Sequence, residues 1–211
     1  MSSILKTMLL ILRETFDFIF PPTEDEKIIA NLETQHFTNK IHIQTTGEVI
    51  SLSSFRDPEM RAAIHLIKFH GNKHALKLTA ALLETWLLSK PEQQYILIPL
   101  PLSNRRYRER GFNQSEQIAQ VSTHKMNHVT IRTDILTRNK HTAPQSSLSK
   151  EKRIKNVSGA FSVNVDKLAP LRGTHIILFD DVVTTGATMR EAKTTLFSHI
   201  HSPITCVALA H

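Results

Sequence analysis

Residues 175–190 read HIILFDDVVTTGATMR, and this stretch decides the fold that the sequence predicts. It opens with an apolar run from Ile176 to Phe179, which is typical of a strand buried on both faces of a parallel sheet. Asp180 and Asp181 then mark the carboxyl end of that strand. Ligands of open α/β sheets bind in the crevice beyond this end. We therefore expect an α/β fold, with a parallel sheet flanked by helices and a binding site beside the two acids.

A turn of small residues follows the acids and leads into a helix that continues from Met189 to Phe197. Unpaired N–H groups at a helix start favour an anion, and threonine hydroxyls can donate to phosphate oxygens. The upstream carboxylates can accept hydrogen bonds from a ribose diol. The expected phosphate-binding residues are Thr184, Thr185, Gly186, Ala187 and Thr188. The segment predicts a site for a phosphorylated sugar, whereas a polar turn and a well-capped helix would be the purely structural alternative.

Residues Ile176 to Thr188 resemble the ribose-phosphate binding motif of the type I phosphoribosyltransferases, with both acids and the TTGAT turn intact. The sequence contains no GxxxxGK[ST] and no GxGxxG loop, which argues against an ATPase and a dinucleotide-binding domain. The resemblance implies the type I phosphoribosyltransferase fold with a flexible hood loop. It also implies phosphoribosyl pyrophosphate as the ligand, accompanied by Mg²⁺.

A second polar block follows the strand expected from Tyr95 to Ile98, which Pro99 and Pro101 end. An arginine-rich loop comes next, and its guanidinium groups could bind pyrophosphate bidentately. A solvated basic turn is the alternative. Asn113 followed by Glu116 indicates a capping box at the start of the next helix.

A pattern in this block resembles that of the ComF family, phosphoribosyltransferase-like proteins associated with DNA uptake and natural competence. The pattern is PLPL, here at residues 99–102, followed by an arginine and then by RGFNQ, here at 110–114. The similarity extends from about Arg61 to the C-terminus and includes IKFHG at residues 67–71. It implies that PLPLSNRR is the pyrophosphate loop and that residues 138–156 form the hood, which sets the acceptor in related enzymes together with local backbone contacts. Lys68 and Phe69 could line that acceptor region, with core packing as the alternative. The candidate pyrophosphate contacts are Ser103, Arg105, Arg106 and Arg110, and the candidate hood contacts are Arg138, Gln145 and Arg153.

The hood segment itself is polar and basic, with no long apolar run. Loops of this length in compact domains are either functional lids or disordered segments. A lid would exclude water from a reactive sugar cation, and disorder without function is the alternative.

The resemblance implies that a nitrogen nucleophile displaces pyrophosphate from the anomeric carbon. Asp180 and Asp181, the candidate catalytic residues, would orient the ribose and favour positive charge on its ring. Mg²⁺ would be held mainly by ligand oxygens and water, so we expect no dedicated metal site in the protein.

Composition sets the remaining bounds. The chain has 211 residues and a formal net charge of +7, which suits a globular protein that attracts phosphates, nucleic acid or an anionic membrane. Cys206 is the only cysteine, so the chain lacks the four-cysteine zinc finger of many ComF-type proteins and any intramolecular disulfide. We expect Cys206 to be buried in the last strand. The twelve histidines form no recognisable metal-binding array.

The expected organisation is an N-terminal segment over residues 1–55 and a phosphoribosyltransferase-like domain over residues 56–211. The apolar spacing from Ile4 to Phe20 predicts an amphipathic helix, whose apolar stretch is too short and too interrupted by charges to span a membrane. Because we recognise no signal sequence, we expect a cytoplasmic location. The other expected helices cover 24–36, 57–69, 74–88 and 113–125. A hairpin is expected over 40–52, a strand over 129–136, a lid arm over 160–165 and a final strand over 204–210, beside the motif strand.

Three functions remain open from the sequence: an active transferase, a catalytically silent sensor of the sugar pyrophosphate, and a competence protein that handles single-stranded DNA. The intact acids and threonines favour ligand binding, but a fold does not determine chemistry. The sequence indicates neither the acceptor nor the oligomeric state, and the competence machinery is a candidate partner.

Overall fold

The computed structural model describes residues 22–139 and 159–211. The expected helix from Ile4 to Phe20 and the hood residues Gln145 and Arg153 lie outside the described residues. The helices are α2 (Glu24–Ile29), α3 (Thr34–Thr38), α4 (Pro58–His70), α5 (Lys73–Leu88), α6 (Asn104–Arg110), α7 (Gln114–Thr123) and α9 (Ala187–Phe197), with short 3₁₀ turns at Val165–Lys167 and Ala169–Leu171. None of these described helices combines the length and the apolar character needed to cross a bilayer.

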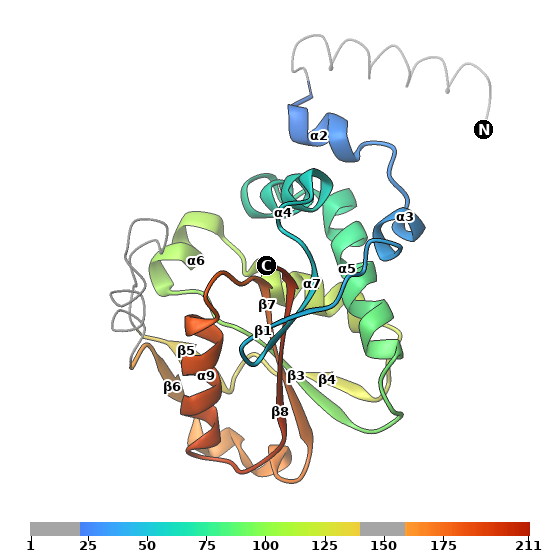
Figure 1. Cartoon of the computed structure of the whole chain (residues 1–211). Coiled ribbons are helices and arrows are strands. Elements are labelled where there is room, and N and C mark those ends of the chain that lie inside the picture. Colours follow the sequence, from blue (N-terminus) through green and yellow to red (C-terminus); the bar gives the residue numbers. More distant parts are fainter. Residues whose placement is uncertain (1–21, 140–158) are drawn as a thin grey trace, which may run out of the picture.

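A mainly parallel sheet forms the centre of the described chain (Figure 1). Its strands are β1 (Gln44–Thr46), β2 (Val49–Ser53), β3 (Tyr95–Pro99), β4 (Val129–Ile131), β7 (His175–Val182) and β8 (Ile204–Ala210). The spatial order is β1-β2-β8-β7-β3-β4, and every pair is parallel except the β1–β2 hairpin. The final strand β8 pairs with the motif strand β7, as the sequence predicts.

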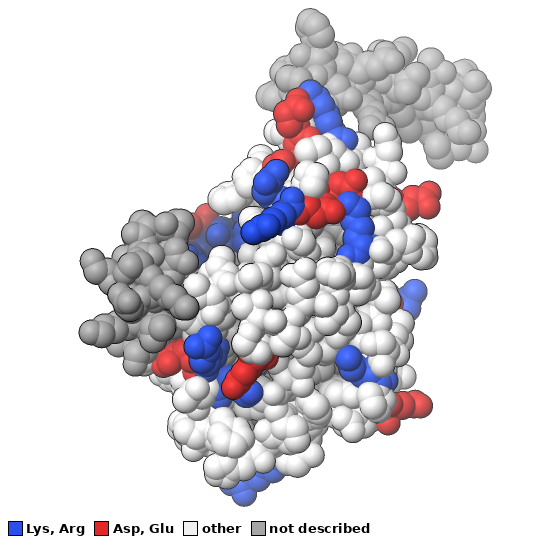
Figure 2. All heavy atoms as spheres, viewed as in Figure 1, with Lys and Arg blue, Asp and Glu red and all other residues white. Residues whose placement is uncertain are grey.

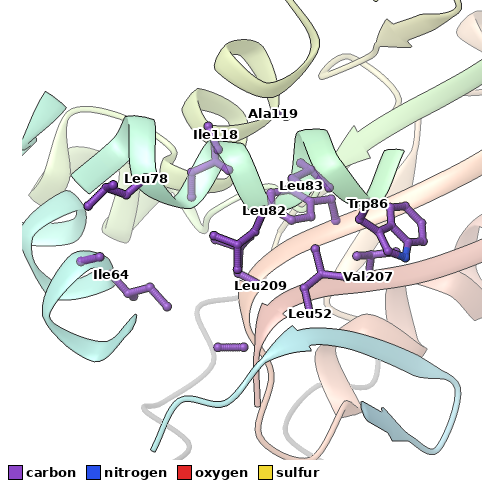
Figure 3. Close-up of a cluster of buried hydrophobic side chains, with 14 of the residues drawn as sticks. Leu52, Ile64, Leu78, Leu82, Leu83, Trp86, Ile118, Ala119, Val207 and Leu209 are labelled. Carbon is purple, nitrogen blue, oxygen red and sulfur yellow. The ribbon is translucent and has the colours of Figure 1, made fainter. Parts of the chain in front are cut away.

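Helices cover both faces of this sheet, which explains the uninterrupted apolar run from Ile176 to Phe179 in β7. Side chains alternate between the two faces of a strand. Ile177 and Phe179 of β7 pack into a cluster with α4, α5 and α7, whereas Ile176 and Leu178 pack into a second cluster with α9. Figure 3 shows the first cluster, where leucines of α5 meet Leu52 of β2 and Leu209 of β8. Cys206 is buried in the second cluster, as expected.

Local capping sets the bounds of α4 and α5 close to the predicted ones. The Asp57 carboxylate accepts hydrogen bonds from the N–H groups of Glu59 and Met60, and Gly71, in the left-handed region at φ +57°, ends α4. The Asn72 side chain then caps α5 in the same way. The end of α4 is therefore fixed within a residue, which matters because Lys68 and Phe69 lie there.

Two predicted elements are wrong in the N-terminal part and in the middle of the chain. The single helix expected over 24–36 is two short helices, α2 and α3, because the chain turns after Ile29, where the Leu32 N–H donates to the Ile29 carbonyl. The single strand expected over 129–136 breaks after Ile131, where Arg132 folds back onto Asp134 with a 2.7 Å ion pair. The chain resumes as β5 (Leu136–Arg138), which pairs with β6 (Phe161–Val163) in a separate antiparallel ribbon.

The expected hairpin over 40–52 is confirmed as β1 and β2, with Gly47 in the turn at φ +61°. Its second strand is not isolated, because β2 pairs in parallel with β8. The hairpin therefore extends the central sheet.

Candidate functional site

A cavity of about 390 Å³ lies at the carboxyl ends of β3 and β7. Its walls come from α4, the segment after β3, α6, the start of α7, the end of β5, and the turn between β7 and α9. The residues that line it are Lys68, Leu100, Pro101, Leu102, Arg106, Arg110, Gln114, Arg138, Asp180, Asp181, Val182, Val183, Thr184, Gly186, Ala187, Thr188 and Met189. This is the crevice in which α/β sheets bind ligands, and it brings most of the predicted site residues together.

The two acids belong to the strand rather than following it, because β7 continues to Val182. The Asp180 side chain is half-buried, and its Oδ1 atom accepts hydrogen bonds from the Ser115 hydroxyl at 2.9 Å and from the Asp181 N–H at 2.9 Å. Asp181 is only 5% exposed. Its Oδ1 atom accepts from the Val182 N–H, and its Oδ2 atom accepts from the Gln114 amide at 3.2 Å. Both carboxylates are thus fixed in orientation.

Lys68 of α4 provides the positive charge nearest to Asp181. Its ammonium group lies 2.7 Å from Asp181 Oδ2, and its side chain is 20% exposed. Burial acts to raise the pKa of Asp181, but the charge and hydrogen bond of Lys68, with the Val182 N–H and Gln114, outweigh burial and hold that pKa below its usual range. Asp181 is therefore ionised at neutral pH.

Asp180 behaves in the opposite way. Burial and the negative charge of Asp181 raise the pKa of Asp180 to about 7, although the Ser115 hydroxyl and Lys68 act against the shift. Two adjacent carboxylates in one cavity thus differ in charge near neutrality, and a cation or a set of hydroxyl donors entering the cavity would favour the ionised form of Asp180.

The turn between β7 and α9 brings the start of a helix to the edge of the cavity. Gly186 has φ +71° and is the residue that precedes α9. A Cβ atom there would lie 3.5 Å from the Val49 side chain and would require a left-handed conformation that other residues rarely adopt. Thr184, Gly186, Ala187 and Thr188 line the cavity, as predicted. Thr185 does not, and its hydroxyl accepts instead from the Ala187 N–H at 3.5 Å.

The predicted arginine-rich loop is a helix, α6, and this changes which of its residues reach the cavity. The Ser103 hydroxyl accepts a hydrogen bond from the Arg106 N–H and so caps the helix. Helical spacing turns Arg106 and Arg110 toward the cavity. Arg105 is 63% exposed and pairs with Glu109 at 2.7 Å. Ser103 and Arg105 are therefore not among the lining residues.

Gln114, at the start of α7, links the arginines to the acids. Its amide oxygen accepts from Arg110 at 3.0 Å, while its amide nitrogen donates to Asp181. Burial lowers the pKa of Arg110, and Asp181 opposes this shift. The preceding residue, Asn113, caps α7 as predicted, but Glu116 accepts from the Gln120 side chain rather than completing a capping box.

Arg138 brings the base of the expected hood to the same cavity. It is the last residue of β5, opposite Phe161 of β6, and its guanidinium carbon lies 5.5 Å from the centre of the Phe161 ring. Burial lowers the pKa of Arg138, with Asp180 opposing the shift and Arg106 adding to it. Four cationic side chains, Lys68, Arg106, Arg110 and Arg138, thus surround two carboxylates.

Sequence reasoning did not assign Gln114 and Ser115 to the site and left Lys68 open between the acceptor region and the core, although each of the three contacts one of the acids. A signal was present, because Lys68 lies in the IKFHG element and Gln114 ends RGFNQ. Their proximity to β7 depends on how α4 and α7 pack, which short motifs do not specify.

Comparison with characterised sequences connects this site with competence proteins. No protein-family model matches the chain. A "DNA utilization protein YhgH" of Salmonella typhi is 32% identical over 148 residues, which cover 68% of this chain and 63% of that protein. "Competence protein ComFC" of Bacillus subtilis is 28% identical over 134 residues, covering 63% of this chain and 51% of that protein. "Competence protein F" of Haemophilus influenzae is 38% identical over 96 residues, covering 45% and 41%.

This chain belongs to the ComF family. It spans roughly three fifths of the length of the YhgH proteins that it matches. The expected membership of the ComF family is therefore confirmed. All three elements that suggested it line the cavity: PLPL through Leu100 and Pro101, RGFNQ through Arg110 and Gln114, and IKFHG through Lys68.

Proposed function

We propose that this cavity binds phosphoribosyl pyrophosphate and that the chain has the type I phosphoribosyltransferase fold. One observation carries the proposal: the cavity joins a fixed acid pair, a left-handed glycine turn before a helix, and cationic side chains from three further elements. A sugar that carries a phosphate at one end and a pyrophosphate at the other complements this arrangement.

The 5-phosphate is assigned to the turn from Thr184 to Thr188, because N–H groups at the start of α9 and the threonine hydroxyls can donate to its oxygens. The ribose hydroxyls are assigned to Asp180 and Asp181, which can accept two hydrogen bonds from a diol. The pyrophosphate is assigned to Arg106, Arg110 and Arg138. Arg110 already donates to Gln114, so the ligand would enter an existing hydrogen-bond network.

Magnesium fits this arrangement as a companion of the ligand. Over residues 22–139 and 159–211, no group of three or more His, Cys, Asp or Glu side chains could hold a metal ion. Asp181 Oδ2, one of the carboxylate oxygens in the cavity, already accepts hydrogen bonds from Lys68 and Gln114. When bound, Mg²⁺ would neutralise charge on the pyrophosphate, and the Asp180 carboxylate, which lines the same cavity, would help to hold its hydration shell.

The supported reaction is pentosyl transfer. A nitrogen of the acceptor forms a bond to the anomeric carbon as the bond from that carbon to the pyrophosphate oxygen breaks. The electron pair leaves with pyrophosphate, and the N–H proton of the acceptor passes to water. Asp181, and Asp180 once the bound ligand favours its ionised form, stabilise positive charge that develops on the ribose ring. No protein nucleophile is needed, and Cys206 does not supply one, because burial raises the pKa of its thiol to about 11.

The relatives' names support a biological setting for the proposed binding activity. Proteins named for competence and for DNA utilisation match this chain, and we infer a role in handling DNA or the nucleotides derived from it. A silent sensor of the sugar pyrophosphate would use the same cavity without turnover. Release of pyrophosphate in the presence of a suitable acceptor distinguishes the transferase from the sensor.

Isothermal titration with phosphoribosyl pyrophosphate and Mg²⁺ tests the proposal. The Asp180→Asn, Asp181→Asn double variant removes both charges and keeps one acceptor oxygen at each position, which can serve Ser115 and Lys68, although the Val182 N–H then loses its acceptor at position 181. It should lose binding, and circular dichroism checks that the variant is folded. Equal affinity of the variant and the original protein would remove the acids from the site.

A further inference from the structure

The turn between β7 and α9 separates two cavities. Besides the cavity already described, a second one of about 560 Å³ lies toward β1 and the segment that follows β2. Val182, Val183 and Thr184 line both cavities, so the start of the turn forms the wall between them. His211, which directly follows β8, lines the second cavity. Groups in the second cavity can therefore act on the turn from the side opposite a ligand.

His211 is held in place by its own backbone. Its N–H donates to the Ser53 carbonyl at 3.3 Å, and its carbonyl accepts from the Phe55 N–H at 2.9 Å. These bonds continue the parallel pairing of β8 with β2. From this fixed position, the imidazole Nε2 atom lies 2.8 Å from the Thr184 carbonyl oxygen. A carbonyl oxygen only accepts hydrogen bonds, so Nε2 carries a proton and is the donor.

A second donor holds the next carbonyl of the turn. The Arg190 guanidinium, in the first turn of α9, donates to the Thr185 carbonyl at 3.3 Å. Lys193 of the same helix pairs with Glu48 of the β1–β2 turn at 2.6 Å. Figure 2 shows basic and acidic side chains side by side where that hairpin turn lies against α9. Two successive carbonyls are thus engaged by side chains that lie outside residues 184–188.

The orientation of these carbonyls fixes that of the N–H groups beside them. In a planar trans peptide, the C=O and N–H bonds point in opposite directions. The Thr185 N–H therefore points away from His211, and the Gly186 N–H points away from Arg190. N–H groups attract a phosphate, whereas carbonyl oxygens repel it. Donors that hold the carbonyls on one side thus orient both peptide groups for an anion on the other.

We propose that His211 and Arg190 are positioning residues for the phosphate end of the ligand. They hold the Thr184 and Thr185 carbonyls away from the first cavity and so preset the turn for a phosphate monoester. This inference rests on the proposed function, and it gives the 5-phosphate site a support from outside the cavity, since neither side chain is among the residues that line it. Preset donors need no reorganisation when the ligand arrives.

The test compares the phosphate end with the pyrophosphate end. Ribose 5-phosphate and pyrophosphate are titrated separately by calorimetry into the full chain and into two variants, His211→Ala and His211→Gln. The glutamine amide can donate to the Thr184 carbonyl, whereas alanine cannot. His199→Ala is the matched control, because the His199 ring also contacts a backbone carbonyl, that of Thr195 at 2.9 Å, but at the opposite end of α9.

We expect ribose 5-phosphate to bind His211→Ala about fivefold more weakly, the loss typical of one hydrogen bond, and to bind His211→Gln and His199→Ala within about twofold of the original protein. Pyrophosphate should bind all four proteins equally. A merely structural role of His211 would weaken both ligands alike or would not be rescued by glutamine, and either outcome overturns the inference. The inference also fails if ribose 5-phosphate does not bind the original protein.

Heteronuclear NMR of the histidine rings gives a check that needs neither a variant nor a ligand. At a pH where the ring is neutral, the His211 proton should reside on Nε2, and a proton on Nδ1 would overturn the inference even if His211→Ala failed to fold.

Phosphoribosyl pyrophosphate, titrated with Mg²⁺, separates the inference from the proposed function. If it binds no more tightly than pyrophosphate while ribose 5-phosphate binding still depends on His211, the proposed function fails and the positioning role stands. If it binds tightly and equally to the original protein and to His211→Ala, the proposed function stands and the positioning role fails.

Discussion

The ammonium group of Lys68 lies 2.7 Å from Oδ2 of Asp181, joining the end of α4 to the carboxyl end of β7. This ion pair connects an element near the start of the ComF similarity with the sugar-phosphate motif. It also accounts for the unequal behaviour of the two acids, because Lys68 acts mainly on Asp181 and leaves Asp180 with a raised pKa.

Replacing Lys68 with methionine should destabilise the protein at pH 7, because a buried carboxylate would lose its partner. Breaking such a pair costs about 3 kcal/mol, and partial exposure of Lys68 favours a smaller value. Urea unfolding measures the change. Lys77→Met on the exposed side of α5 is the control and should change stability little. Adding Asp181→Asn to Lys68→Met should restore part of the loss, and a strictly additive loss would contradict a direct interaction.

Asp180 should make stability depend on pH in a defined direction. Its folded-state pKa, about 7, lies above the value near 4 of an unfolded aspartate, so the folded protein binds the proton more tightly. The contribution of Asp180 to stability therefore declines as pH rises from about 4 to about 7 and is constant above that.

The Asp180→Asn variant should consequently gain stability relative to the original protein between pH 5 and pH 8. Denaturation curves at several pH values measure the difference in unfolding free energy between the two proteins. Both proteins contain the same histidines, so the histidine contribution cancels in this difference. Asp134→Asn is the control, since Arg132 lowers the pKa of Asp134 and no titration of that group falls in this range. A constant difference for Asp180→Asn across the range would show that Asp180 titrates normally.

Gly186→Ala should weaken ligand binding as well as stability. Gly186 and Gly173 both have left-handed φ angles, +71° and +76°, so alanine at either should cost about 1 kcal/mol. Gly186 lines the cavity and precedes α9, whereas a Cβ atom at Gly173 meets nothing within 4 Å. Calorimetry should show reduced affinity for phosphoribosyl pyrophosphate only in Gly186→Ala. A parallel loss in both variants would mean that the effect is one of folding.

The two neighbouring arginines of α6 should differ in their effect on pyrophosphate binding. Arg106 lines the cavity, but Arg105 is exposed and paired with Glu109. Loss of a hydrogen bond to a charged group weakens binding about tenfold or more, which we expect for Arg106→Ala. Arg105→Ala should stay within about twofold in the same titration, and the reverse order would contradict the orientation of α6.

The sequence predicted the parts of this fold that follow from local pattern. The uninterrupted apolar runs of β3 and β7 reflect burial on both faces, and the caps at Asp57 and Asn113 are local hydrogen bonds. The helix α6 was mistaken for a loop because its charged sequence has no apolar face, and none of its residues is buried. It is held by the Ser103 cap and by Gly111, at φ +77°.

The motif segment carries its part of the site within one stretch of chain, whereas Arg106, Arg110 and Arg138 were assigned to the site through the family resemblance. The turn from Thr184 to Thr188 and both acids are contiguous, so their shared location follows from the chain itself. The contacts of Lys68, Gln114 and Ser115 arise between elements that are distant in sequence. Packing of α4 and α7 on the sheet decides these contacts, and local patterns do not encode that packing.

The most direct test of the central claim compares phosphoribosyl pyrophosphate with its two halves. Each of phosphoribosyl pyrophosphate, ribose 5-phosphate and pyrophosphate is titrated calorimetrically with Mg²⁺ present. If the turn before α9 and the arginines of α6 hold the two ends of one ligand, the intact molecule should bind at least a hundredfold more tightly than either half, because linked groups share the entropic cost of association. Phosphoribosyl pyrophosphate that binds no more tightly than pyrophosphate alone would contradict a sugar-pyrophosphate site and leave a simple anion site.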